Sequence, residues 1–349
     1  MSYKLLYIED QKADTIKSEL INRGFDVEVY EPETFDKYVN HIQKNDYDAY
    51  IMDFRLTEGH GLVDAPTYAA TQRTFGKNRR EKPIILITNE NNLPEFENDF
   101  TSQDLFDIVL GKDNFRHDYD KYSQRIKALI NAYKTIKVKE FDIKTILGIN
   151  NIEDLDYRFI SKLINFKSKE DIYGYSRTIL NSLIRAIGPL VGREVLAARL
   201  GIESSCADFE KLLNKPQIAC CQYKGIMSDS YDRWWFDEIK LMWKVISSNS
   251  LRRLEAQDRV EILNEYFKLK LQPAEPLSQA TSTNFWTICH KLKKPLDPID
   301  GYPYNIRHFD EWLEPDYISL NAALEYPELR DYLSPVDKRN VFILGGYEQ

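Results

Sequence analysis

The run "AYIMDFRL", residues 49–56, decides the fold of the first part of the chain. Its apolar residues end on one carboxylate, Asp53, and Arg55 follows two residues later. A short apolar run is typical of a buried strand, and a charged group at its end needs a partner or a chemical role. The run therefore predicts a strand whose carboxyl end carries a functional group.

The first 135 residues alternate between strand-like and helix-like segments on both sides of that run. The predicted strands are Lys4–Ile8, Asp26–Tyr30, Ala49–Met52, Pro83–Ile87 and Asp107–Leu110. The predicted helices are Ala13–Arg23, Thr34–Gln43, Leu62–Thr74, Pro94–Ser102 and Tyr119–Ile136. Strands that alternate with helices predict an α/β fold, a doubly wound parallel sheet covered by helices on both faces.

The ends of the predicted strands carry residues suited to phosphoryl transfer. Ligands bind such sheets outside the carboxyl ends of the strands, where Glu9, Asp10, Asp53, Thr88 and Lys112 are expected. Three neighbouring acids repel one another, and a cation such as Mg²⁺, which prefers oxygen ligands, relieves that repulsion. A carboxylate beside the metal can attack a phosphoryl donor. Lys112 supplies a positive charge for the phosphoryl oxygens, and Thr88 supplies a hydroxyl donor.

These five positions resemble the active site of receiver domains in bacterial two-component response regulators, over about residues 3–136. The resemblance implies a five-stranded sheet of order 2-1-3-4-5, with Asp53 as phosphoacceptor and a sensor histidine kinase or phosphotransfer protein as donor. It also implies Mg²⁺ held by the three acids and by the backbone carbonyl of Arg55, and Gly61 fits the family's loop. The chain departs from the family where Asp113 replaces a proline and Val109 replaces an aromatic residue.

The remainder of the chain has a different character. We expect residues 1–136 to form the receiver domain and residues 143–349 to form a mainly α-helical output or interaction domain, which holds all five tryptophans. The helices predicted there are 154–165, 169–186, 192–200, 207–213, 233–247 and 256–269, with a terminal strand at 341–344. No second catalytic motif is present, so only self-catalysed phosphotransfer and dephosphorylation are expected as enzymatic activity.

Two segments of this second part allow alternative interpretations. Residues 193–213 resemble a helix-turn-helix, but Glu203, Asp208 and Glu210 lie in the would-be recognition helix, which argues against DNA binding and favours two packed core helices. Trp235, Ile239, Met242 and Ile246 form one helical stripe, with Trp243 beside it, which favours either core packing or the surface of a homodimer or protein partner.

Composition narrows the class of protein. The net charge is −8, and residues 1–140 carry 20 basic and 25 acidic groups, so bulk charge does not indicate a nucleic-acid surface. We expect a cytoplasmic protein, because no export signal or membrane-spanning segment is seen and the four cysteines lack disulfide-type spacing. The adjacent Cys220–Cys221 and Cys289–His290 pairs do not have the spacing of a zinc site.

Several functions fit this pattern. The main hypothesis is a response regulator that passes phosphorylation of Asp53 to a helical interaction domain that does not bind DNA. A phosphate sink or relay, of the kind found in phage-defence two-component pathways, is the alternative within signalling. The others are an enzyme switched by the receiver and an atypical transcription regulator.

Overall fold

The computed structural model describes residues 2–32, 34–56, 63–74, 81–93, 96, 103–304 and 310–346. Its contacts divide the chain into two compact units, which are described separately. Unit 1 comprises Met1–Glu153, Tyr157–Thr178 and Gly225–Ser230. Unit 2 comprises Asp154–Asp156, Ile179–Lys224 and Tyr231–Gln349. The predicted division into domains at residues 136 and 143 stays a prediction.

A five-stranded parallel sheet forms the centre of unit 1, and its order β2-β1-β3-β4-β5 confirms the expected fold. The strands are β1 (Tyr3–Ile8), β2 (Phe25–Tyr30), β3 (Ala49–Met52), β4 (Ile84–Thr88) and β5 (Ile108–Gly111). Every residue of β3 and β4 is buried, as expected for strands covered on both faces. Their apolar side chains pack with the neighbouring helices into one core, which includes Leu6, Met52 and Leu86.

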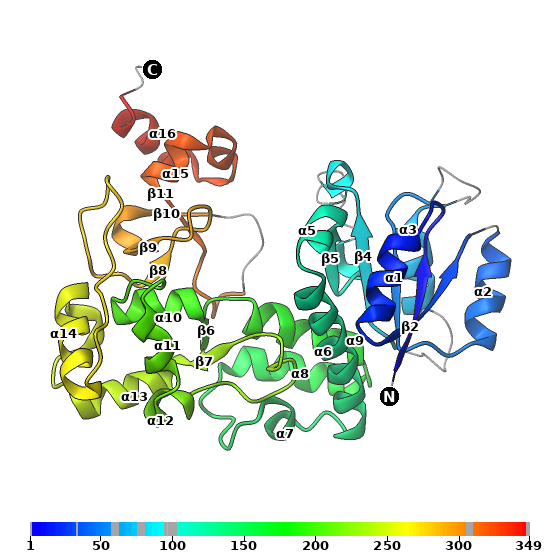
Figure 1. The fold of residues 1–349 in the computed structure, drawn as a ribbon, viewed down its shortest axis with the longest axis horizontal. Coiled ribbons are helices and arrows are strands. Elements are labelled where there is room, and N and C mark those ends of the chain that lie inside the picture. The colour runs from blue at the N-terminus through cyan, green and yellow to red at the C-terminus, as the bar shows by residue number, and fades with distance from the viewer. Residues whose placement is uncertain are drawn as a thin grey trace. The chain divides into compact units, whose positions relative to one another are not determined.

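Helices connect the strands of this sheet, as Figure 1 shows. The connecting helices are α1 (Asp14–Asn22), α2 (Phe35–Lys44) and α3 (Ala65–Thr74), and α5 (Lys112–His117) and α6 (Tyr119–Val138) follow β5. Side chains fix where some of them begin. The Thr34 hydroxyl accepts the backbone N–H of Lys37, and the Asp118 carboxylate accepts that of Lys121 at 3.1 Å. Gly61, residues 77–80 and most of the helix predicted at Pro94–Ser102 lie outside the described residues.

Three further helices of unit 1 follow the sheet: α7 (Ile143–Leu147), α8 (Tyr157–Ser168) and α9 (Ile172–Ile179). The Arg73 guanidinium lies 3.6 Å from the ring centroid of Tyr173 in α9. Arg73 also pairs with the buried Asp107 at 2.8 Å, and Asp107 accepts the Tyr133 hydroxyl at 2.6 Å. Asp107 directly precedes β5, so α9 is attached at the amino end of that strand.

The described residues of unit 2 are mainly helical, with three pairs of very short antiparallel strands. Its helices are α10 (Arg193–Leu200), α11 (Ala207–Leu213), α12 (Pro216–Ala219), α13 (Phe236–Ile246), α14 (Ala256–Phe267), α15 (Leu320–Glu325) and α16 (Pro335–Leu344). Its strands are β6 (Leu190–Gly192), β7 (Arg233–Trp235), β8 (Thr287–Ile288), β9 (Pro295–Leu296), β10 (Gly301–Pro303) and β11 (Tyr317–Ser319). A π-helical turn, Leu180–Ile184, and β6 precede α10.

The structure corrects one expectation and refines another in this unit. Residues 341–344 lie in α16 rather than in a strand, because Pro335 stands in the first turn and the Ser334 hydroxyl accepts the Asp337 N–H at 3.1 Å. Helices α10 and α11 both pack into one large core cluster of the unit, through residues such as Leu196 and Phe209. On α13, Ile239 and Trp243 are buried, whereas the exposed fractions of Leu241 and Val245 are 55% and 77%.

Candidate functional site

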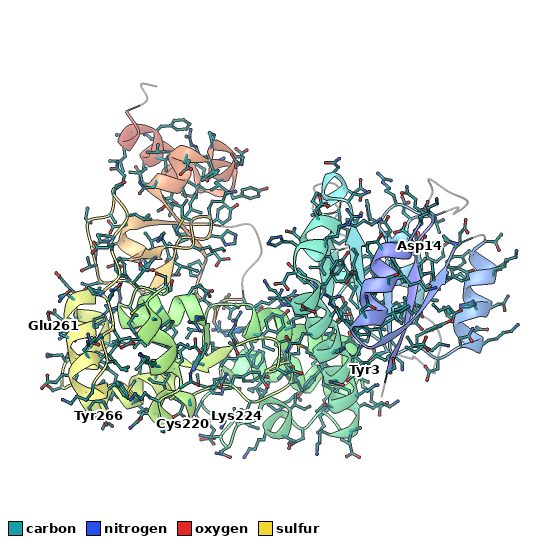
Figure 2. The ribbon with its side chains drawn as sticks, in the orientation of Figure 1. Tyr3, Asp14, Cys220, Lys224, Glu261 and Tyr266 are labelled. Atoms are coloured by element: carbon teal, nitrogen blue, oxygen red, sulfur yellow. The ribbon has the colours of Figure 1, made fainter. Side chains whose placement is uncertain are left out.

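The residues singled out at the strand ends gather at one edge of the parallel sheet. They are Glu9 and Asp10 after β1, Asp53 after β3, Thr88 at the end of β4 and Lys112 after β5. The register aligns these ends, because Ile8 pairs with Met52 and Thr88 pairs with Gly111. Tyr3, the first residue of β1, marks the opposite edge of the sheet in Figure 2. Asp14, at the start of α1, lies near the carboxyl edge.

Lys112 connects two of the acids directly. Its Nζ lies 2.8 Å from Asp53 Oδ2 and 2.9 Å from Glu9 Oε2, and all three side chains are almost fully buried. Burial alone would lower the pKa of the Lys112 ammonium, but the hydrogen bonds and charges of Asp53 and Glu9 outweigh it, so that this pKa is raised. Lys112 therefore stays protonated, as a fixed positive charge beside the carboxylates.

The surroundings of Glu9 disfavour its ionised form. Burial, followed by the negative charge of Asp53, raises the pKa of the Glu9 carboxyl, although Lys112 and Tyr7 act in the opposite direction. The Tyr7 hydroxyl donates to Glu9 Oε2 at 2.8 Å. Burial and the charge of Glu9 raise the pKa of Tyr7 well above its usual value, so the phenol remains a hydrogen-bond donor. No pattern in the sequence indicates this role of Tyr7.

The carboxylates also meet the requirements of a divalent cation. Glu9, Asp10 and Asp53 each offer one oxygen, and these oxygens all lie within 4.8 Å of one another. Mg²⁺ takes oxygen ligands and keeps several of its waters, so two or three carboxylates at one edge fit it. The Asp53 carboxylate is itself held in place, because its Oδ1 accepts the backbone N–H of Phe54 at 2.7 Å. The donor set therefore fits Mg²⁺.

Two other predicted positions have identifiable surroundings. Thr88 is fully buried, and its hydroxyl accepts a hydrogen bond from Asn92 Nδ2 at 3.2 Å. The Arg55 side chain forms an ion pair with Asp64, with 3.0 Å between Nη1 and Oδ2. Asp64 also accepts the backbone N–H of Leu56 at 3.1 Å, so it ties down the chain that follows Asp53. A metal contact through the Arg55 carbonyl remains a prediction.

Glu90 has a role that the sequence did not reveal. Its Oε1 accepts the backbone N–H of Asp113 at 2.7 Å and that of Asn114 at 3.3 Å, which caps the first turn of α5. The Glu90 cap therefore holds the segment that follows Lys112. Gly111 allows this approach, since a Cβ there would lie 2.2 Å from Glu90 Oε1.

In the part of the chain that the structure describes, no helix is long and apolar enough to cross a membrane.

The four cysteines are free thiols; Cys220 is exposed and Cys221 buried. Burial, together with the neighbouring Cys220, raises the pKa of the Cys221 thiol to about 12. Cys220 and Tyr266, both labelled in Figure 2, line a groove of about 320 Å³ beside α13.

Comparison with known proteins returned similarities at the level of solved structures. No protein-family model matches the sequence, and no curated protein matches it. A response regulator receiver domain from Methylobacillus flagellatus is 19% identical, with a TM-score of 0.29; the match covers 36% of this chain and 99% of that one. The receiver domain of a sensor histidine kinase from Pseudomonas aeruginosa, with magnesium in its active-site cleft, is 23% identical, with a TM-score of 0.30 over 38% and 99% of the two chains.

A response regulator from Thermotoga maritima in complex with Mg²⁺ and BeF is 21% identical, with a TM-score of 0.29 over 37% of this chain and 99% of that one. These matches cover little more than a third of the chain. The sheet order and flanking helices seen in the structure itself give that N-terminal part the fold of response-regulator receiver domains.

Proposed function

We propose that the protein is a two-component response regulator whose receiver domain, residues 1–136, accepts a phosphoryl group on Asp53 with Mg²⁺ as cofactor. The donor is a sensor histidine kinase or a phosphotransfer protein. The observation that carries the proposal is the position of Lys112 Nζ, within 2.9 Å of both Asp53 and Glu9 at the carboxyl edge of the sheet. Ion pairs that serve stability alone do not require three acids at one site.

Each side chain has a task in the proposed reaction. A carboxylate oxygen of Asp53 forms the new P–O bond as the P–N bond of the donor phosphohistidine breaks, and the imidazole leaves with the electron pair. Lys112 is already in contact with Asp53 Oδ2, so its charge is placed to bind an oxygen of the transferred group. The Thr88 hydroxyl supplies a further donor. Glu9, Asp10, Asp53 and the Arg55 carbonyl would hold Mg²⁺, which would supply positive charge beside the phosphoryl oxygens.

The test is phosphorylation of the full chain by a small phosphodonor such as acetyl phosphate in the presence of Mg²⁺, followed by intact-mass measurement. The wild-type chain should gain one phosphoryl group, and Asp53→Asn should gain none. Asp26→Asn, which removes an exposed aspartate in β2, serves as the matched control and should label as wild type does. Equal labelling of wild type and Asp53→Asn would overturn the assignment.

We further propose that residues 143–349 act as an interaction domain rather than as a DNA reader. Support comes from α10 and α11, whose apolar residues are used in the core, and from the exposed Leu241 and Val245 on α13, which favour a protein partner or a second copy of the chain. Gel-shift binding to DNA fragments that weakens steeply with salt would contradict this proposal. Sedimentation with and without phosphodonor distinguishes a second copy from another partner.

A further inference from the structure

A buried phenol lies directly beneath the carboxyl edge of the sheet. Tyr7 occupies the second-last position of β1, two residues before Glu9, and its exposed fraction is 0%. Side chains two residues apart along an extended strand point to the same side. Glu9 continues the extended pairing, because its N–H donates to the Tyr30 carbonyl at 3.2 Å. The Tyr7 hydroxyl therefore reaches the Glu9 carboxylate from within the fold.

The two oxygens of Glu9 have different surroundings as a result. Oε2 accepts both the Tyr7 hydroxyl, at 2.8 Å, and Lys112 Nζ, at 2.9 Å. Oε1 accepts the backbone N–H of Gln11 at the longer distance of 3.3 Å. Two strong donors occupy the lone pairs of Oε2, so Oε1 is the oxygen better able to bind a cation.

We propose that Tyr7 is a positioning residue that acts through Glu9: by fixing Oε2, it presents Oε1 to the divalent cation and so sets the affinity of the site. The inference rests on the proposed function, because it needs the cation to bind there. Glutamate is longer than aspartate and has one more rotatable bond, so it loses more freedom when it becomes a ligand. The Tyr7 hydrogen bond fixes that extra freedom before the cation arrives.

The experiment measures cation affinity directly on the full chain, with Mn²⁺ as the probe, by the EPR signal of the free ion and with Mg²⁺ as competitor. Partners that orient a metal ligand typically affect affinity by 10–100-fold, so Tyr7→Phe should raise the Kd for Mn²⁺ on the order of 10-fold. Tyr133→Phe is the matched control. It also removes a buried phenol that donates to a carboxylate, but at Asp107, at the amino end of β5, and its Kd should stay within about 2-fold of wild type.

A double-mutant cycle separates positioning from a general loss of packing. In the Glu9→Gln background, Tyr7→Phe should have no further effect on the Kd, because the group through which it acts has been replaced. An undiminished effect in that background, or equal affinities of wild type and Tyr7→Phe, would overturn the inference and leave the proposed function intact. If the wild-type chain bound no Mn²⁺ at all, the proposed metal site would itself be wrong, and the inference would fall with it.

Discussion

At the scale of single residues, the site combines two opposing charge effects. Glu9 and Asp53 are buried acids whose mutual repulsion is unfavourable, and Lys112 offsets it by contact with both. Removing Lys112 would leave the buried carboxylates of Glu9 and Asp53 without the ammonium group that neutralises them. Buried charges alone rarely contribute net free energy to folding, so the cluster agrees with the proposed chemical role better than with a purely stabilising one.

The raised pKa of Glu9 predicts how stability depends on pH in the absence of divalent cations. The folded state binds this proton more tightly than the unfolded state, whose carboxyl titrates near 4.5. The contribution of Glu9 is therefore most favourable below that pH and is lost as the pH rises through the higher folded-state pKa. In EDTA, the urea midpoint of wild type should fall relative to that of Glu9→Gln as the pH rises above 4.5.

The expectation is checked by unfolding the full chain in urea at several pH values. Hydrogen exchange of the β1 and β3 amides reports the unfolding of unit 1. Glu31→Gln, which replaces an exposed glutamate just after β2, is the control and should give a profile parallel to wild type. If the profiles of Glu9→Gln and wild type were also parallel, the folded-state pKa of Glu9 would not be raised.

At the scale of elements, α9 and the β4–β5 pair belong together. Arg73 donates to Asp107 and to the Lys82 carbonyl, and Tyr173 of α9 covers its guanidinium. Asp107 also accepts the backbone N–H of Ile84 at 2.9 Å, so one buried carboxylate joins the starts of β4 and β5. The contact places α9 in the same compact unit as the sheet.

Replacing Tyr173 by leucine should loosen this end of the sheet. The loss of a partly desolvated cation–π contact costs about 1–2 kcal/mol. Amides of β4 and β5 that exchange through opening of this contact should then exchange roughly 5–30-fold faster. Tyr157→Leu, at a tyrosine of α8 whose exposed fraction is 76%, should leave these rates unchanged. Unchanged rates in Tyr173→Leu would show that the ring does not stabilise the pair.

At the scale of the whole molecule, the tryptophans provide a natural reporter. All five lie in unit 2, and Trp234 and Trp243 are buried there. If phosphorylation of Asp53 biases the state of residues 143–349, acetyl phosphate with Mg²⁺ should change the tryptophan emission of wild type but not that of Asp53→Asn. An identical response in both chains would show that the signal does not pass from Asp53 to the second part.

The sequence predicted the sheet and its strand ends well, for a physical reason. Buried parallel strands need short apolar runs, and a parallel register brings their ends together, so Asp53 and Lys112 could be placed at one edge without coordinates. Tyr7 and Tyr173 were missed because each acts through a tertiary contact that leaves no periodic signal. The strand predicted at 341–344 was wrong because the helix start at Ser334, seven residues earlier, determines the conformation of that apolar run.

The attachment of α9 has a mechanical consequence. Lys112 directly follows β5 at the carboxyl edge, and Asp107 directly precedes it at the other. At about 3.3 Å per residue, this strand of four residues spans only about 13 Å. If a phosphoryl group on Asp53 displaced Lys112, the Asp107–Arg73 pair and Tyr173 would be the contacts at the opposite end of the same short strand. Strand β5 would then connect the phosphoryl group at its carboxyl end with α9 at its amino end.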